Sequence, residues 1–244
     1  ELLGYMFVHQ ERPIGRVVLE GGVLQAHRGK GVGTRLFEWA LDCGRQASAS
    51  IAHVAAQEGD TDQIAFLKAR GFTLVRHHVQ MRWSGDSVPE PKLPDGFSFR
   101  PFRAGDEGGL TKAQNAAFST QWGFSPNTVE QVAYSVNMSR SDTGGVALLM
   151  AGDEVVGYCW TQTAGEDTSI VGSVLMVGVH PKYQGKGLGR AVLFFGMTSL
   201  LQRGTQVVEL TVDRENAAAR ELYTSVGFVK TGGQEWYEAT LSAD

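Results

Sequence analysis

Two similar stretches of this chain lie 156 residues apart. They are GGVLQAHRGKGVGT over residues 21–34 and VGVHPKYQGKGLGR over residues 177–190. The same spacing separates two Gly-Phe dipeptides, at residues 71–72 and 227–228. Because one spacing serves two separate motifs, chance in a glycine-rich sequence is a poor explanation. We therefore predict two copies of one α/β unit.

The two copies differ in length and in completeness. ELLGY at residues 1–5 resembles EVVGY at residues 154–158 with a spacing of 153. Because the glycine loops have a spacing of 156, the second copy has a small insertion between this match and its glycine loop. By this register, roughly 57 residues at the start of the second copy, its opening strand and helices, have no counterpart in the first. The chain begins at Glu1 without a Met, and we expect its true start to lie upstream.

The boundary between the copies is the segment WSGDSVPEPKLPDG, residues 83–96. Its three prolines and two glycines exclude a regular element and indicate a semi-rigid connector. We therefore predict a partial first domain over residues 1–83, a linker over residues 84–96 and a complete second domain over residues 97–244.

Hydrophobic periodicity and capping signals predict the elements of the second domain. A strand at residues 97–102 precedes a helix that Asp106 caps and that reaches Phe118, and Thr128 has capping-box spacing to Gln131 for a second helix. The later predicted elements are a hairpin of residues 145–150 and 154–163, a strand at 169–179, a helix at 188–203 that stops at Gly204, a strand at 206–212, a helix from Asn216 through Val226 that Gly227 ends, and a strand at 234–241 that closes the sheet. This order is typical of an α/β domain.

Composition argues against several classes of protein. The chain has 42% hydrophobic and 20% charged residues, as globular proteins do, and its net charge of −4 includes no basic run of the kind that nucleic-acid binders carry. Cys43 and Cys159 lack metal-type spacing, so we expect no disulfide framework, no metal site and a reducing, cytoplasmic location. No apolar run reaches the ~18 residues of a membrane span, and no signal peptide opens the chain.

The glycine loop of the second copy has the features of an anion site. After the strand ends at a His-Pro dipeptide, the backbone amides of Gly185, Gly187 and Gly189 face the start of the next helix. A helix N-terminus has unpaired N–H groups, and glycines let a phosphate approach the backbone closely. Lys186 and Arg190 add positive charge. The plainer interpretation is a turn that only tightens a strand-to-helix crossover.

Two other nucleotide-binding motifs fit less well. A P-loop requires G-x-x-x-x-G-K-[ST], but Lys30 and Lys186 are each followed by glycine. A dinucleotide fingerprint requires G-x-G-x-x-G directly after a strand, whereas the spacing here is G-x-G-x-G and Arg190 replaces the third glycine. Glu209 falls near the acidic position of that fingerprint, so a dinucleotide-binding protein stays open as a distant alternative.

Two motifs together resemble the acetyl-CoA motifs of the GCN5-related N-acetyltransferases. They are V-x-V-H-P-x-x-Q-G-K-G-L-G-R and, after it, LTVDRENAAARELYTSVGF at residues 210–228. The resemblance covers residues 97 to about 241 as a whole domain and residues 1 to about 83 as the later part of another. VQMRW, PEPKLPDG and NAAF further resemble the linker region of mycothiol synthases, which are tandem acetyltransferases. The resemblance implies tandem mixed sheets whose fourth and fifth strands splay apart, so that the pantetheine arm lies between them.

The resemblance also implies which residues bind acetyl-CoA. Backbone groups of Val177 and Val179 pair with pantetheine as an added strand would, and Asn216 contacts the coenzyme arm. The pyrophosphate loop consists of Gln184, Gly185, Lys186, Gly187, Leu188, Gly189 and Arg190. The matching loop of the first half consists of Arg28, Gly29, Lys30, Gly31, Val32 and Gly33, which keeps the geometry for a second phosphate site.

Tyr223 matches the tyrosine beside the thioester sulfur, and the chemistry supplies a reason for it. Attack by an amine expels a thiolate whose conjugate acid has a pKa near ~8.5, and a phenol with a pKa near ~10 can donate a hydrogen bond or a proton to that thiolate without being ionised at neutral pH. The alternative is an aromatic packed in the core. Ala219, Leu222 and Val226 already give this helix an apolar stripe, which favours catalysis.

The general base and the acceptor pocket stay open. Mycothiol synthases resemble one another in a Glu on the fourth strand, where this chain has Ser173. Glu209 and, acting through water, His180 are candidates for the base. The plainer interpretation of each is a solvated or a capping side chain. Candidates for the acceptor pocket are the aromatics Trp122, Phe124, Tyr134, Tyr158 and Trp160 and the loop carboxylates Glu166 and Asp167, for which core packing and solvation are the plainer interpretations.

The first half lacks the residues that carry the chemistry. At the spacing of 156, Tyr223 falls on Leu67 and Asn216 on Asp60, so we expect a non-catalytic structural partner. The sequence thus predicts an enzyme that transfers acetyl from acetyl-CoA to a primary amine of a small molecule by direct attack. The alternative from another class is a coenzyme A-binding regulatory module without catalysis. Neither the amine nor the oligomeric state follows from the sequence.

Overall fold

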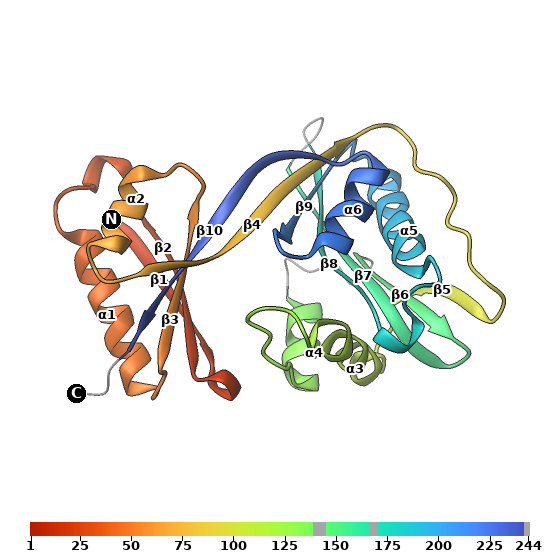
Figure 1. The fold of residues 1–244 in the computed structure, drawn as a ribbon, viewed down its shortest axis with the longest axis horizontal. Helices are drawn as coiled ribbons and strands as arrows, with labels where there is room; N and C mark the ends of the chain where they lie inside the picture. Colours follow the sequence, from red (N-terminus) through yellow and green to blue (C-terminus); the bar gives the residue numbers. More distant parts are fainter. Residues whose placement is uncertain (139–144, 166–169, 242–244) are drawn as a thin grey trace. The chain divides into compact units, whose positions relative to one another are not determined.

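The computed structural model describes residues 1–138, 145–165 and 170–241. Its first half contains β1 (Gly4–Glu11), β2 (Arg16–Val23), α1 (Val32–Gln46), β3 (Ile51–Gln57), α2 (Thr61–Lys68) and β4 (Thr73–Ser84) (Figure 1). Its second half contains β5 (Phe97–Pro101), α3 (Glu107–Phe118), α4 (Val129–Asn137), β6 (Val146–Ala151), β7 (Glu154–Ala164), β8 (Val171–Val179), α5 (Leu188–Gln202), β9 (Val207–Asp213), α6 (Ala217–Val226) and β10 (Val229–Thr240). After β6, the second half repeats the element order of the first.

Most predicted elements form within a residue or two of their expected ends. The capping box of α4 is present, because the Thr128 hydroxyl accepts a bond from the Gln131 amide at 3.2 Å and the Gln131 side chain accepts one from the Thr128 amide at 2.8 Å. Asp106 does start α3, but not by side-chain capping. Its carboxylate instead binds the guanidinium of Arg100, which lowers the pKa of Asp106. The helix ends where it was expected, at Phe118.

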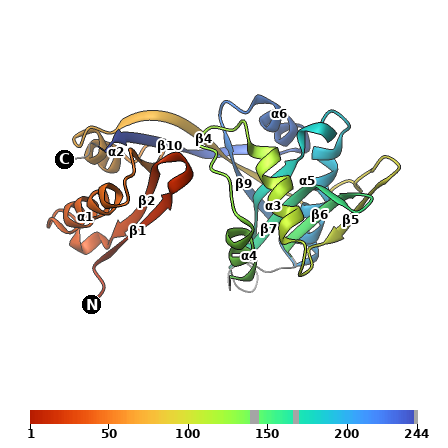
Figure 2. The same cartoon turned by 90° about the horizontal axis from the view of Figure 1, so that it is seen from below.

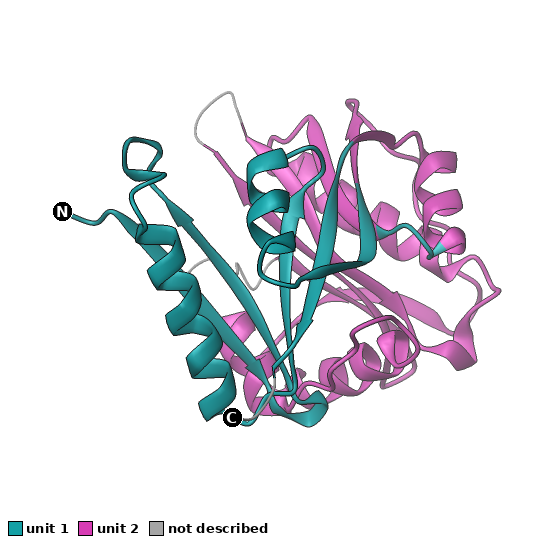
Figure 3. Cartoon of the chain, turned by 60° about the vertical axis from the view of Figure 1, so that its left-hand side comes forward, with its two compact units in different colours: residues 1–79, 213–216, 232–244 teal, residues 80–212, 217–231 magenta. Residues whose placement is uncertain are grey.

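The strands follow the hydrogen-bonded order β1-β2-β3-β10-β4-β9-β8-β7-β6-β5, a mixed sheet with helices on its faces. Two compact units divide it, and neither follows the chain order (Figure 3). Unit 1 comprises Glu1–Val79, Asp213–Asn216 and Gly232–Asp244, and unit 2 comprises Gln80–Val212 and Ala217–Thr231. The last strand of each half therefore supplies residues to the unit that is built mainly from the other half.

Unit 1 is completed by the C-terminal strand of the chain. β3 pairs in parallel with β2 on one side and antiparallel with β10 on the other, where Ile51–Gln57 face residues 234–240. Helices α1 and α2 cover one face, and Phe37 and Leu67 from these helices pack into one core with Tyr237 of β10. Tyr237 is 1% exposed, so burial of its ring contributes to the stability of this core.

Unit 2 contains the end of β4 and the strands β5 to β9. The amide of Gly85 donates to the carbonyl of Gln206, which fixes the end of β4 beside β9. Helices α3 and α4 cover one face of this sheet and α5 and α6 the other (Figures 1 and 2). Beneath α3 and α4 lies a core that includes Leu110, Val132 and Leu148. No helix among the described residues is long and apolar enough to cross a membrane.

Helix α5 approaches β7 closely at Gly196. A Cβ placed on Gly196 would lie 2.3 Å from Sγ of Cys159, a fully buried thiol whose pKa burial raises to about 12. We expect Gly196→Ala to lower the free energy of unfolding by about 1–3 kcal/mol, because the core must shift to admit the methyl group.

Denaturation by urea measures this effect, and Gly108→Ala is its matched control. Gly108 lies in α3, and a Cβ there meets nothing within 4 Å. The control should leave the free energy of unfolding unchanged or raise it slightly, because alanine favours the helix. Equal effects of the two substitutions would contradict the close packing of α5 on β7.

Candidate functional site

Strands β8 and β9 of unit 2 pair only over the first part of their length. The parallel ladder runs from Val171 opposite Val207 to Val174 opposite Leu210 and then stops, while β8 continues to pair with β7 as far as Val179. The two strands therefore separate toward their carboxyl ends, which confirms the predicted splay. Residues 175–179 of β8, including Val177 and Val179, have no strand partner on that side.

A β-bulge lies where the splay begins. Trp160 of β7 faces Met176 and Thr161 faces Val174, so Leu175 has no partner and its side chain is 48% exposed. A bulge bends its strand and redirects the side chains beside it. The sequence carried one sign of it, the change of spacing from 153 to 156 between the two halves. Leu175 is one of those three extra residues, and the other two lie in the sequence between the end of β7 and the start of β8.

The predicted glycine loop of unit 2 joins β8 to α5. Gly185 and Gly187 have φ of 78° and 74°, the left-handed region that glycine adopts without strain, and a Cβ on either would meet nothing within 4 Å. Gly187 is the N-cap of α5, and no side chain caps this helix. The Ala191 amide donates to the Gly187 carbonyl at 3.2 Å and closes the first turn of α5, so the amides of residues 188–190 have no intrahelical acceptor. The loop thus presents open space and free N–H groups to an anion.

Side chains of the loop hold it in place. Gln184 donates from Nε2 to the Val179 carbonyl at 2.9 Å, which ties the loop to the end of β8. Lys186 Nζ lies 5.7 Å from the centroid of the Tyr183 ring, and Arg190 donates to the Ser225 hydroxyl at 2.8 Å. Both cations are therefore near the loop amides and help to make this region attractive to phosphate.

His180 has a structural task in the same connection. It is the N-cap of the short 3-10 helix Pro181–Tyr183, and its Nδ1 accepts a bond from the Lys182 amide at 3.2 Å. One of its two ring nitrogens is therefore engaged by the backbone. This contact agrees with the capping interpretation rather than with a general base.

Tyr223 is the one buried residue of α6 and packs against Phe228, with ring centroids 5.8 Å apart. Burial raises the pKa of Tyr223, and the Cys159 thiol raises it further. Among the described residues its hydroxyl has no hydrogen-bond partner, yet it is not one of the fully enclosed polar atoms. The phenol therefore stays protonated at neutral pH. Asn216 immediately precedes α6 and lies in the segment Asp213–Asn216 that groups with unit 1.

The glycine loop of unit 1 has the same backbone as the loop of unit 2. Gly29 and Gly31 have φ of 73° and 83°, and Gly31 is the N-cap of α1, which no side chain caps. Arg28 donates from Nε to the Val23 carbonyl at 3.2 Å, so it ties the loop to its strand as Gln184 does. The loop residues Arg28, Gly29, Lys30, Gly31, Val32 and Gly33 therefore have the backbone arrangement of their counterparts in unit 2.

The other matched positions of unit 1 have structural tasks. Leu67, opposite Tyr223 in the repeat, is 1% exposed within the core. Asp60, opposite Asn216, caps α2 by accepting a bond from the Gln63 amide at 3.0 Å. Strands β1 and β2 pair without interruption, so unit 1 also lacks the bulge.

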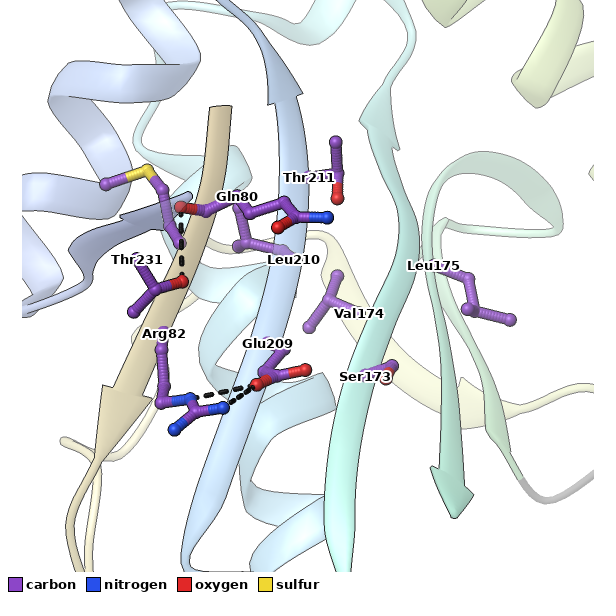
Figure 4. Close-up of a pocket in the computed structure, with 10 residues that line it drawn as sticks. Gln80, Arg82, Ser173, Val174, Leu175, Glu209, Leu210, Thr211 and Thr231 are labelled. Atoms are coloured by element: carbon purple, nitrogen blue, oxygen red, sulfur yellow. Dashed lines mark hydrogen bonds and ion pairs between the residues drawn. The ribbon is translucent and has the colours of Figure 1, made fainter. Parts of the chain in front are cut away.

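A polar cavity of about 440 Å³ opens beside the splayed strands of unit 2 (Figure 4). Its lining comes from four strands and consists of Gln80, Met81, Arg82, Ser173, Val174, Leu175, Glu209, Leu210, Thr211 and Thr231. Arg82 binds Glu209 here, with Nε at 2.8 Å and Nη2 at 2.5 Å from Oε1. Sequence reasoning missed the contribution of β4, because Arg82 lies 127 residues before Glu209.

The predicted aromatic candidates for an acceptor pocket do not share one environment. Tyr158 and Trp160 lie in the core beneath α3 and α4, which agrees with the core interpretation. Tyr134 is 69% exposed on α4. Glu166 and Asp167 lie outside the described residues.

Comparison with known proteins identifies the family. The family described as "Acetyltransferase (GNAT) family" matches residues 1–72 and 110–228. The chain is 34% identical to the mycothiol acetyltransferases of Tsukamurella paurometabola, over 88% of the chain and 75% of the relative, and of Thermobispora bispora, over 94% and 77%. A GCN5-related N-acetyltransferase from Sphaerobacter thermophilus has a TM-score of 0.75 at 25% identity, covering 98% of this chain and 77% of that one. A tandem GNAT protein from the clavulanic acid biosynthesis pathway has a TM-score of 0.72 at 14% identity, over 94% and 76%. The chain therefore belongs to the acetyltransferase (GNAT) family, in its tandem form.

Proposed function

We propose that this acetyltransferase moves the acetyl group of acetyl-CoA to the primary amine of a small polar molecule, and that unit 2 performs the reaction. The observation that carries the proposal is the arrangement of unit 2, where splayed strands, an uncapped glycine-rich helix start and a protonated buried tyrosine occur together. The first half, with Leu67 and Asp60 in place of Tyr223 and Asn216, acts as a non-catalytic partner.

The residues of unit 2 fit a coenzyme A thioester. The open space at Gly185 and Gly187 and the free amides at the start of α5 suit a pyrophosphate. The unpaired side of β8 at Val177 and Val179 suits the amides of pantetheine, which would bind as an added strand. The bound thioester would supply an activated acetyl group.

Tyr223 would assist departure of the sulfur. Because burial keeps the phenol protonated, its hydroxyl can donate a hydrogen bond to the sulfur as negative charge develops there during attack by the amine. A coenzyme A-binding regulator would not need such a donor. Tyr223 therefore favours an enzyme over a binding module.

For the acceptor, we propose the cysteine-glycoside precursor of mycothiol or an amine of similar polarity. Relatives 34% identical over most of their length are named mycothiol acetyltransferase. The cavity beside the splay is lined by side chains that hydrogen-bond hydroxyl groups, among them Gln80, Thr211 and Thr231. Such a lining suits a sugar-bearing amine better than an apolar one.

A panel of amines tests the proposed function. Release of the coenzyme A thiol from acetyl-CoA is followed with the cysteine-glycoside, free aminosugars, amino acids and an apolar alkylamine, and mass spectrometry identifies the acetylated product. We expect the highest kcat/KM for the glycoside. Tight binding of acetyl-CoA without acetylation of any amine would instead support the regulatory module.

A further inference from the structure

We propose that Glu209 is the general base that accepts the proton of the acceptor ammonium, in place of the fourth-strand glutamate that Ser173 replaces. This inference rests on the proposed function and assigns a catalytic residue to it. An ammonium has no lone pair, so an enzyme of this kind must remove one proton before the nitrogen can attack. The hydroxyl of Ser173 cannot take that proton from the ammonium at neutral pH.

Glu209 lies directly across the ladder from Ser173. The two residues are partners in the parallel pairing of β8 with β9, one ladder step before that pairing ends. Neighbouring strands lie about 4.8 Å apart, and partners in a ladder point to the same face. A carboxylate on Glu209 therefore reaches nearly the same space as a carboxylate on Ser173 would.

The side chains of this ladder step point to the face of the sheet opposite α5. Gly172 faces α5, because a Cβ on it would lie 3.0 Å from Leu200, so the following residue, Ser173, faces the opposite way. Glu209 lies between the buried Val208 and Leu210 and shares the face of Ser173. Both residues line the polar cavity (Figure 4).

Arg82 holds Glu209 in a way that leaves half of the carboxylate free. Both Nε and Nη2 of Arg82 bind Oε1 of Glu209, at 2.8 and 2.5 Å, and Oε2 accepts neither bond. The Glu209 side chain is 40% exposed, so Oε2 is open to a ligand in the cavity. Arg82 acts as a positioning residue, and Oε2 is the atom that meets the ammonium.

Glu209 and Tyr223 together move the protons of the proposed reaction. Oε2 of Glu209 takes one proton from the ammonium, the nitrogen lone pair forms the C–N bond to the acetyl carbon, and the C–S bond breaks with its electrons on sulfur. The sulfur takes the proton of the Tyr223 hydroxyl as that hydroxyl takes one, through water, from the nitrogen that is becoming the amide, so no free phenolate forms. Glu209 returns its proton to solvent, so each turnover releases one proton.

The pH profile of kcat/KM for Glu209→Gln tests the assignment. Without the base only the free amine reacts, so we expect a loss of about 10²-fold at pH 7 that shrinks tenfold for each unit of pH rise. Glu38→Gln, which removes an exposed carboxylate on α1, is the matched control and should keep the wild-type profile. A constant loss at every pH, or no loss, would overturn the role of Glu209.

A second variant guards against a purely structural effect. Adding Ser173→Glu to Glu209→Gln should restore at least tenfold of kcat/KM at pH 7, because the new carboxylate enters the same part of the cavity. Failure of this rescue in a double variant that melts at the wild-type temperature would contradict the shared space of the two positions.

Binding without turnover separates this inference from the proposed function. With coenzyme A in place of acetyl-CoA, calorimetry should show that Glu209→Gln weakens binding of the amine acceptor about tenfold and leaves binding of its hydroxyl analogue unchanged. Equal weakening of both ligands would overturn the contact with the ammonium. A wild-type protein that acetylates no amine would overturn the proposed function itself.

Discussion

The Tyr223→Phe variant should turn over about 10²-fold more slowly than the wild type and bind acetyl-CoA with nearly unchanged affinity. The substitution removes only the hydroxyl, and the ring keeps its packing on Phe228. Because burial raises the pKa of Tyr223, the wild-type acid stays protonated well above its ordinary range, so its ionisation should cause no loss of activity near pH 10. Single-turnover kinetics measure the chemical step, and calorimetry measures the affinity.

Tyr237→Phe is the matched control for this variant. Tyr237 is as deeply buried as Tyr223, but it lies in the core of unit 1, where its hydroxyl donates to Glu235 at 2.6 Å. Loss of the Tyr237 hydroxyl should lower the free energy of unfolding slightly and leave the turnover per folded molecule unchanged. Unchanged turnover of Tyr223→Phe, with chemistry shown to be rate-limiting, would exclude Tyr223 as the acid.

Gly187→Val should weaken binding of acetyl-CoA by about 10²-fold or more. A side chain on Gly187 occupies the open space before α5 and disturbs the amides proposed to bind the pyrophosphate, each of which contributes a charge-assisted hydrogen bond. Valine at a φ of 74° also strains the backbone, so the variant will lose some stability. Calorimetry on the folded variant separates the two effects.

The chain provides its own control in Gly31→Val. Gly31 has a φ of 83°, caps α1 and has equally open surroundings, so valine there causes similar backbone strain. If unit 2 alone is catalytic, Gly31→Val leaves kcat and the KM for acetyl-CoA unchanged. Acetyl transfer that disappears in Gly31→Val and persists in Gly187→Val would show that the roles of the two halves are reversed.

The sequence predicted well those features that depend on local signals. The capping box at Thr128 starts α4, Gly187 and Gly204 flank α5, and the loop around Gly187 has the left-handed backbone that glycine allows. The family resemblance then added what local signals lack, the splay of β8 and β9, which the strand pairing confirms.

The exchange of final strands could not be predicted in the same way. Both β4 and β10 are long strands. Their side-chain patterns would fit either unit, so the sequence does not predict which unit each strand joins. The contact of Arg82 with Glu209 depends on that exchange. The sequence therefore did not predict the wall of the polar cavity that β4 supplies. The repeat gives a consistency check afterwards: at the spacing of 156, Arg82 matches Glu238, and Glu238 binds His53 at 2.7 Å where Arg82 binds Glu209.

The place of β10 in unit 1 has a consequence for how the protein is made. A ribosome completes β3 long before it makes residues 234–240, the neighbour of β3 in the sheet. Until then this edge of β3 has no partner and the core around Phe37 lacks Tyr237, so unit 1 can close only after residues 234–240 have been made. A premature stop codon before residue 234 would therefore damage the fold of unit 1, although most of that unit precedes residue 80.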